Sequence, residues 1–182
     1  LDKVFIRNII TNEEEELIFT DEKVYDPSVS LRQKDRDTDE IYISYSTPKT
    51  QNRTYLYNIK TKEKKLVKEQ IIPSGHEPND YIVERLECPS HDGRVVPITI
   101  TRHKNTPIDG SAELLLYGYG SYGHSMSPTF SSTRLSLIKR NIIWATAHIR
   151  GGMERGMKWW KEGKLLNKKN TFKDYIACAK FL

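Results

Sequence analysis

The sequence has no long hydrophobic run, and its first residues do not have the pattern of a leader. Of its 182 residues, 37% are hydrophobic and 29% are charged, and no apolar stretch approaches the ~20 residues that a membrane-spanning helix needs. No basic segment followed by an apolar one opens the chain, so a secretory signal peptide is not expected either. These absences predict a globular, cytoplasmic protein without a membrane partner.

Cysteine is also scarce. Cys88 and Cys178 lie far apart in the sequence, and neither they nor the histidines have the short spacing that zinc sites use. We therefore expect two reduced, buried thiols, with no metal and no cofactor. Three histidines stand in segments of linker or hairpin composition and show no ligand spacing: His76, His91 and His103.

No strong excess of one charge marks the chain. It has 29 lysines and arginines against 24 aspartates and glutamates, a formal net charge of +5. The basic residues are mixed with acids, and the densest run, Lys60–Lys65, stands where a polar turn between strands is expected. A solvated turn explains this run better than a nucleic-acid patch does, and we expect no nucleic-acid partner.

Short β-strands joined by polar hairpins are predicted for residues 1–72. Residues 41–46 alternate with period two, and residues 54–59 form a second run of β-branched and aromatic side chains. A short third strand is expected at 65–67, and the charged segment 35–40 predicts a turn. Such a meander is typical of one blade of a propeller or of part of a β-sandwich.

A change of composition at 73–80, with prolines and no apolar period, predicts an interdomain linker. Tyr81–Cys88 and Val95–Thr101 then predict the two strands of a hairpin, joined by an Asp-Gly turn. Pro97 lies inside the second of these strands. Because proline cannot donate to a neighbouring strand, it favours a position at the edge of the sheet.

Residues 81–182 alternate strands and helices, as an α/β domain does. A buried strand is predicted at 113–117 and another at 141–149, with a helix at 132–140 between them. A right-handed crossover places the two strands side by side in parallel. The glycine-rich loop after the first strand then lies at their carboxyl ends, where such sheets bind ligands.

Two further helices are predicted, at 157–163 and at 170–182. In the second, Asn170 or Thr171 is expected as the N-cap, and Asp174 lies near the positive end of the helix. Apolar side chains at helical spacing predict the face that is buried, namely Phe172, Ile176, Ala179 and Leu182.

The loop Gly118–Gly123 matches the pattern G-x-G-x-x-G of dinucleotide sites. Such a site needs a helix to begin at the third glycine and an acid after the second strand. Here Pro128 and a polar loop precede the helix, and the second strand ends in His148-Ile-Arg150 without an acid. We therefore expect no nucleotide site.

A serine hydrolase of α/β type needs G-x-S-x-G after a later strand, followed by Asp and then His. No serine here has glycines two before and two after it. His124 and His148 come too early in the chain to be the base, and His148 is expected to be structural. The glycine loop could instead stabilise an oxyanion through the hydroxyl of Tyr119. The alternative is a packed aromatic ring with its hydroxyl in solvent.

Several motifs occur in a characteristic order along most of the chain. They are Leu115–Gly123, Phe130–Ser136, His148–Gly152, Trp159 with Glu162–Lys164, and Asn167–Tyr175, preceded by Ile43–Pro48 and Tyr55–Asn58. Together they strongly resemble the prolyl oligopeptidase family of serine peptidases. The form Tyr-Gly-Ser-Tyr-Gly is most similar to the oligopeptidase B branch, which cuts peptides after Arg or Lys.

The resemblance implies a β-propeller joined to an α/β-hydrolase domain. Residues 1–72 would be part of the propeller, its last blade, and 73–80 the interdomain linker. Residues 81–182 would be the N-terminal half of the hydrolase domain, truncated before the nucleophile elbow. By the same resemblance, Tyr119 supplies the oxyanion-hole hydroxyl and Tyr122 is an aromatic of the substrate pocket.

The family's Gly-Gly-Ser-Ala-Gly-Gly elbow and its later Asp and His are absent from these 182 residues. Met153 also replaces the third glycine of the usual Arg-Gly-Gly-Gly-Glu, at a cost of about 1 kcal/mol or more if that position has positive φ. Loss of a triad member costs about 10⁴ to 10⁶ in rate, so we expect the chain alone to be inactive. The helix at 171–182 would also lack much of its packing surface.

Two alternatives stay open. In one, the chain is half of a two-chain peptidase and is completed by a partner chain that carries Ser, Asp and His. In the other, it is a non-catalytic peptide- or anion-binding module.

Overall fold

The computed structural model describes residues 3–18, 20–31 and 38–182. They divide into two units: the chain up to His76 with Pro128–Phe130, and Glu77–Ser127 with Ser131–Leu182. The boundary at His76 falls within the segment 73–80 whose composition is that of a linker. The predicted charged turn at 35–40 lies partly outside the described residues. Within the described residues, none of the helices has both the length and the apolar character needed to cross a lipid bilayer.

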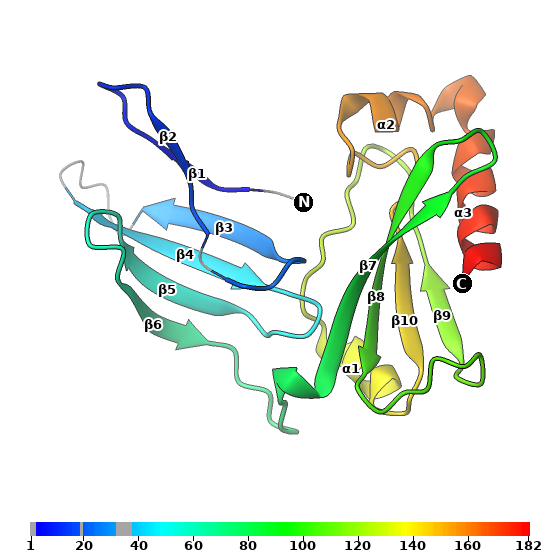
Figure 1. The fold of residues 1–182 in the computed structure, drawn as a ribbon, viewed down its shortest axis with the longest axis horizontal. Coiled ribbons are helices and arrows are strands. Elements are labelled where there is room, and N and C mark those ends of the chain that lie inside the picture. Colours follow the sequence, from blue (N-terminus) through cyan, green and yellow to red (C-terminus); the bar gives the residue numbers. More distant parts are fainter. Residues whose placement is uncertain (1–2, 19, 32–37) are drawn as a thin grey trace. The chain divides into compact units, whose positions relative to one another are not determined.

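An antiparallel meander makes up most of the first unit (Figure 1). Its strands, in spatial order, are β3 (Asp26–Leu31), β4 (Glu40–Ser46), β5 (Arg53–Asn58) and β6 (Lys64–Glu69), and β1 (Phe5–Arg7) pairs with β2 (Glu14–Glu16) as a separate hairpin. Alternate residues of a strand point to one face, so Ile43, Tyr45 and Tyr57 are buried together in the core of this unit.

The meander and its strands β4, β5 and β6 confirm the prediction from the sequence. Strand β3 was missed, because Pro27 and two serines hide any β pattern there. β3 is at the edge of the four-stranded sheet. An edge strand tolerates proline, because one side of its backbone needs no partner.

A mixed sheet forms the centre of the second unit. Its strands are β7 (Tyr81–Pro89), β8 (Val95–His103), β9 (Leu114–Tyr117) and β10 (Ile143–Ala147), in the spatial order β7-β8-β10-β9. β10 pairs in parallel with β9 and antiparallel with β8. The parallel pair confirms the predicted side-by-side arrangement of these two strands.

Pro97 does not mark an edge strand, and that prediction was wrong. β8 has β7 on one side and β10 on the other. The carbonyl of Pro97 accepts a hydrogen bond from the backbone N–H of His148, at 2.9 Å, so the nitrogen of Pro97 faces β10 as well. The register between these strands ends at Ala147 opposite Ile98. The missing N–H therefore falls where β10 has already ended, and the sheet loses little by it.

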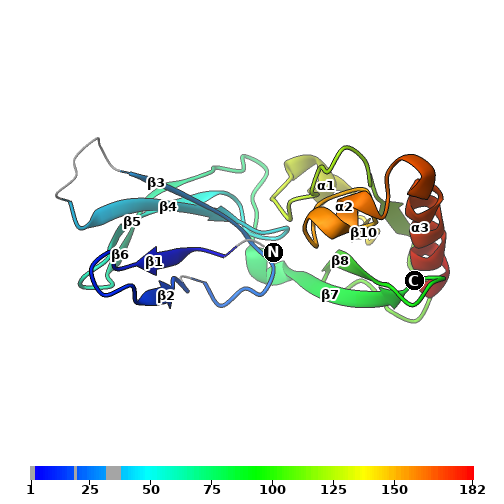
Figure 2. The same ribbon diagram turned by 90° about the horizontal axis from the view of Figure 1, so that it is seen from above.

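Helices and short 3₁₀ turns complete the second unit. They are η1 (Pro78–Asp80), α1 (Ser132–Ile138), α2 (Met157–Lys161), η2 (Leu165–Asn167) and α3 (Lys169–Phe181). Ser131 caps α1, since its hydroxyl accepts the N–H of Arg134. In Figures 1 and 2, α3 lies along the sheet of this unit. Its residue Cys178 joins a buried cluster with Cys88 of β7 and Ile98 of β8.

The orientation of α3 differs from the prediction in two ways. The helix begins at Lys169 without a side-chain cap, because the Thr171 hydroxyl donates instead to the carbonyls of Arg150 and Gly163, at 2.7 and 3.1 Å. The expected apolar face is turned outward: Phe172 is 60% exposed and Ile176 is 53% exposed. The buried residues of α3 are Thr171, Asp174 and Cys178.

Strand β9 was predicted to be buried, and it is not. Leu114, Leu115 and Tyr117 are each between 37% and 40% exposed. Within the described residues β9 has a single neighbour, β10, so one side of its backbone is open. The hydroxyl of Tyr175 in α3 donates to the carbonyl of Leu116, at 2.8 Å, which ties the helix to this strand.

A buried ion-pair network decides how α3 docks. Arg150, directly after the β10 segment, is 1% exposed. Its Nε and Nη2 donate to the two carboxylate oxygens of Asp174, at 2.8 and 2.6 Å, and its Nη1 donates to Asp92 in the β7–β8 turn, at 2.6 Å. The hydroxyl of Ser90 also donates to Asp174. One guanidinium thus joins a turn, a loop and a helix.

The charges of this network stabilise one another. Burial opposes the charged form of Arg150, but its bonds to Asp174 and Asp92 raise its pKa nonetheless. The hydrogen bond from Arg150 in turn lowers the pKa of Asp92. A buried charge whose partner is removed is strongly destabilising, because its lost hydration is no longer compensated.

We therefore expect Arg150→Met to lower the free energy of unfolding of the second unit by about 3–5 kcal/mol. Urea unfolding followed by tryptophan fluorescence measures this, because Trp144, Trp159 and Trp160 all lie in that unit.

Arg155→Met is the matched control. Arg155 also stacks on Trp159, but its pair with Glu87 is exposed, so the loss should stay below about 1 kcal/mol. Equal losses in the two variants would contradict the role assigned to Arg150.

Candidate active site

The glycine loop Gly118–Gly123 follows β9 and lies at the carboxyl ends of the parallel strands β9 and β10. Gly120 has φ +61°, and a Cβ there would lie 2.6 Å from side-chain atoms of Ile149 and Thr171. Only glycine fits this position, because the loop packs directly against the segment that follows β10. The N–H of Gly123 donates to the carbonyl of Gly151, at 2.9 Å, which closes the contact between the two loops.

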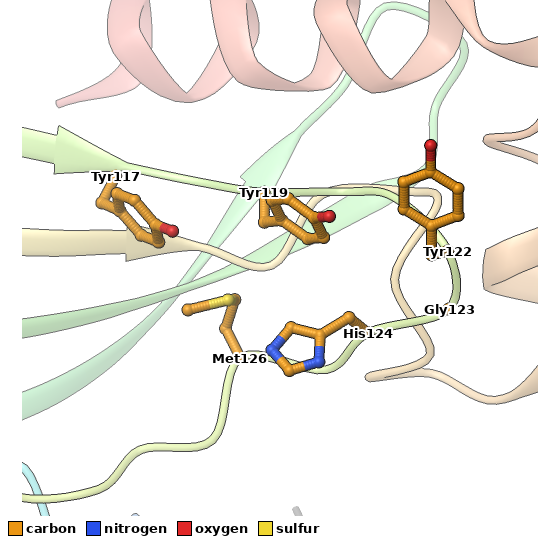
Figure 3. Close-up of a pocket in the computed structure, with 6 residues that line it drawn as sticks. All are labelled: Tyr117, Tyr119, Tyr122, Gly123, His124 and Met126. Carbon is orange, nitrogen blue, oxygen red and sulfur yellow. The ribbon is translucent and has the colours of Figure 1, made fainter.

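The outer side of this loop forms a pocket of about 610 Å³. We call it the tyrosine pocket; its lining residues are Tyr117, Tyr119, Tyr122, Gly123, His124 and Met126. Figure 3 shows the hydroxyls of Tyr117 and Tyr119 pointing along the loop toward Tyr122. The pocket is aromatic and open, and no cluster of three or more histidine, cysteine or acidic side chains able to hold a metal occurs in the described part of the chain.

Tyr119 sits in the middle of this pocket and is 44% exposed. Its ring packs against the edge of His124, with 5.7 Å between the ring centroids. Its hydroxyl makes no hydrogen bond to another described residue, so the O–H is free to donate to a ligand. Oxyanion stabilisation uses a hydrogen-bond donor of this kind, aimed at the developing charge.

Tyr122 lies at the end of the pocket and is 90% exposed. Its backbone has φ +55°, a left-handed conformation that is uncommon for a residue with a side chain. In Figure 3 its hydroxyl points away from His124. The backbone strain turns this ring out of the loop, where a ligand can contact it.

Two residues that the sequence did not single out hold the glycine loop and the segment directly after it. The ammonium group of Lys168 donates to the carbonyl of Gly120 and to the hydroxyl of Ser121, at 2.6 and 2.7 Å. Glu154 accepts the N–H of Met126, at 3.0 Å. These contacts join segments that are 28 to 48 residues apart, so no local pattern could have revealed them.

His148 is a buried supporting residue and does not face the tyrosine pocket. It is 2% exposed, its Nε2 shares a 2.8 Å hydrogen bond with Thr99, and its Nδ1 lies 3.6 Å from Glu154. Burial lowers the pKa of His148, although Glu154 acts in the opposite direction. Burial alone would raise the pKa of Glu154, but the nearby His148 ring and the hydrogen bond from the Met126 N–H lower it.

The strain expected at Met153 is not present, because Met153 is not among the residues with positive φ. Its side chain packs beside Gly123 instead, where an added Cβ would lie 3.0 Å from the Met153 sulfur. The thiols of Cys88 and Cys178 are free and buried, as predicted. They lie close enough to interact, and burial raises the pKa of both.

Known proteins share this chain's sequence and fold. Residues 128–182 match the Prolyl oligopeptidase family. The chain is 39% identical over 178 residues, 97% of its length, to Dipeptidyl aminopeptidase BI of Pseudoxanthomonas mexicana. It is 36% identical over 174 residues, 96% of its length, to Protease 2 of Moraxella lacunata.

Solved structures of oligopeptidases agree. Oligopeptidase B from Trypanosoma brucei, in a closed form with covalently bound antipain, matches 99% of the chain with a TM-score of 0.88 and 34% identity. The chain covers 26% of that structure and spans about a quarter of the length of the curated relatives it matches, 24% and 25% for the two named above.

Gly120→Ala should destabilise the second unit and disturb the glycine loop. Positive φ costs about 1–2 kcal/mol for an alanine, and the close contacts with Ile149 and Thr171 add about 1–3 kcal/mol of overpacking. Gly110→Ala is the control, since Gly110 has φ +88° but nothing within 4 Å of an added Cβ. Urea unfolding of both variants checks this, and a loss at Gly120 no greater than at Gly110 would refute the close packing.

Acid should weaken the fold through His148. Its pKa is lowered from the ordinary 6.5 in the folded chain, so the unfolded chain binds a proton that the folded chain does not. The contribution of neutral His148 to the free energy of unfolding is therefore complete above about pH 6.5 and is lost as the pH falls below that value. Glu154, whose pKa is also lowered, adds to the loss only at more acid pH.

The free energy of unfolding should accordingly fall between about pH 7 and pH 5.5, and this slope should be smaller in His148→Gln. Urea titrations at several pH values measure both slopes. Identical slopes would show that His148 does not titrate differently in the folded and unfolded chain.

Proposed function

The chain is related to the prolyl oligopeptidase family of serine peptidases, and on that premise we propose that its tyrosine pocket forms half of an oligopeptide-hydrolysing site. The environment of Tyr119 is the main support for the proposal. Its hydroxyl is unbonded within the described residues, its ring contacts His124, and it stands at the carboxyl ends of β9 and β10. Ligands of open α/β sheets bind at that end.

In this proposal Tyr119 acts when a serine attacks the scissile carbonyl. The serine proton passes to a histidine base, and the carbonyl oxygen gains a negative charge in the tetrahedral intermediate. The Tyr119 O–H donates a hydrogen bond to that oxygen. Removing one such donor costs about 10²–10³ in kcat. Tyr122, exposed at the end of the pocket, is proposed to contact the substrate.

The serine, the aspartate and the histidine base come from residues outside these 182, either on the same polypeptide or on a partner chain. The outward apolar face of α3, with Phe172 and Ile176, and the open edge of β9 support a contact with such residues. Exposed apolar surface of this kind marks an interaction site. The isolated 182 residues are expected to hydrolyse nothing.

The finer assignment of the fold belongs to the same proposal. The four-stranded meander of the first unit is assigned to the last blade of a propeller, and the second unit to the first half of an α/β-hydrolase domain. The match of both units to oligopeptidase B structures supports this. The substrates proposed are oligopeptides cut after Arg or Lys, as in the oligopeptidase B branch.

A graft tests the function. The 182 residues replace the matching segment of Protease 2 from Moraxella lacunata, and hydrolysis of an arginyl chromogenic peptide is followed. The hybrid should be active, and Tyr119→Phe in it should lower kcat by about 10²–10³ with little change in KM, because the hydroxyl acts on the transition state.

Tyr117→Phe is the matched control, since it removes a hydroxyl from the same pocket away from the proposed oxyanion; kcat should stay within about twofold. The isolated chain should give no hydrolysis that a serine-directed phosphonate blocks. An active hybrid in which Tyr119→Phe behaves like Tyr117→Phe would refute the role of Tyr119.

A further inference from the structure

One segment of the second unit, which runs from α2 into α3, is strongly basic. Between Met157 and Lys173 the sequence has a single acid, Glu162. The segment has six lysines: Lys158, Lys161, Lys164, Lys168, Lys169 and Lys173. Its local net charge of +5 equals the formal net charge of the whole chain. The expectation of scattered basic residues missed this, because the lysines are mostly three or four residues apart.

Two of these lysines line a second pocket, of about 400 Å³. We call it the lysine pocket; the lining residues that matter here are Ser121, Tyr122, Trp160, Lys164 and Lys168. Tyr122 also lines the tyrosine pocket, so one exposed ring borders both.

The two ammonium groups are held in place. Lys164 has its Nζ 3.4 Å from the ring centroid of Trp160, a cation–π contact that fixes a side chain which is otherwise flexible. Lys168 donates two of its three hydrogens to Gly120 and Ser121. One N–H of Lys168 has no partner among the described residues, and burial lowers its pKa, which reflects a cation that has lost water.

We propose that the lysine pocket binds a carboxylate of a peptide whose chain lies in the neighbouring tyrosine pocket. The inference rests on the proposed function in so far as it takes the ligand to be a peptide. Lys164 and the remaining N–H of Lys168 supply charge-assisted donors to the carboxylate. Trp160 and Tyr122 supply the apolar walls for the residue that carries it.

A peptide fits this arrangement better than a nucleic acid does. Strands of nucleic acid bind along basic grooves with several stacking platforms for successive bases. Here a single ring, Tyr122, connects a largely aromatic pocket to one with two fixed ammonium groups. An apolar pocket beside a charged one suits a peptide, because successive side chains of a peptide can be apolar and then charged.

Binding of three uncleaved peptides to the 182-residue chain tests this by calorimetry. They are acetyl-Ala-Arg-Ala-Ala with a free C-terminal carboxylate, the same peptide as its amide, and the amide of acetyl-Ala-Arg-Ala-Glu. At least one carboxylate peptide should bind about tenfold more tightly than the amide that has no carboxylate, a difference of about 1.4 kcal/mol. If the free-acid peptide binds more tightly, the pocket takes a C-terminal carboxylate; if the glutamate peptide does, the pocket takes an acidic side chain.

Variants locate the effect. Lys164→Gln should weaken the preferred carboxylate peptide about fivefold and leave the amide unchanged. Lys169→Gln is the matched control, because it removes the same charge from an exposed residue outside the pocket, and the affinity should change by less than about twofold. Lys168 is left intact, because it also braces the glycine loop.

Equal affinity for acid and amide, or no binding of any peptide, overturns the proposal. An equal loss of peptide affinity in Lys164→Gln and Lys169→Gln also overturns it. So does displacement of the peptide by a single-stranded oligonucleotide whose own affinity falls equally in both variants. These results would indicate a diffuse basic surface. The graft experiment is independent: an active hybrid with no preference for the carboxylate leaves the peptidase function standing and removes only the lysine pocket.

Discussion

The paired charges of Arg150 and Asp174 determine how the second unit is put together. A guanidinium with 1% exposure and a carboxylate with none are tolerable only when each satisfies the other. Since Asp174 lies in α3, the helix must turn the side that carries Asp174 toward the segment after β10. Thr171 and Cys178 turn inward with it. The apolar residues on the other side, among them Phe172 and Ile176, are left facing outward.

This orientation of α3 also shapes the glycine loop. The methyl group of Thr171 lies where a Cβ would be if Gly120 were replaced. A Cβ at Gly151 would likewise collide with the carbonyl of Gly120. The two loops therefore approach at backbone distance. Close packing of backbone on backbone is stiff, and stiffness is what a hydrogen-bond donor to a transition state needs. The backbone on either side of Tyr119 thus depends on an ion pair that lies outside the tyrosine pocket.

Electrostatics divides the surface near Tyr119 into two parts. The tyrosine pocket offers rings and a free hydroxyl, while the lysine pocket behind Tyr122 offers two held ammonium groups. Lys168 links them, because the same ammonium that faces the lysine pocket bonds the carbonyl of Gly120. A ligand carboxylate there would draw on a cation that also braces the glycine loop.

By itself the sequence determined the elements whose signals are local. Periodic side chains marked β4, β5, β7 and β8, the apolar runs and the capped α1 marked the crossover between β9 and β10, and the ordered motifs marked the family. What only the tertiary structure decided was every feature that depends on residues far apart in the chain. In the folded chain, α3 buries Asp174 and exposes its apolar face, and β9 is left exposed. Pro97 lies inside the sheet, at a point where β10 has ended. Lys164 and Lys168 lie beside Tyr122. Periodicity counts apolar residues along one element, whereas a buried charge must be paired, and its partner comes from a distant part of the chain.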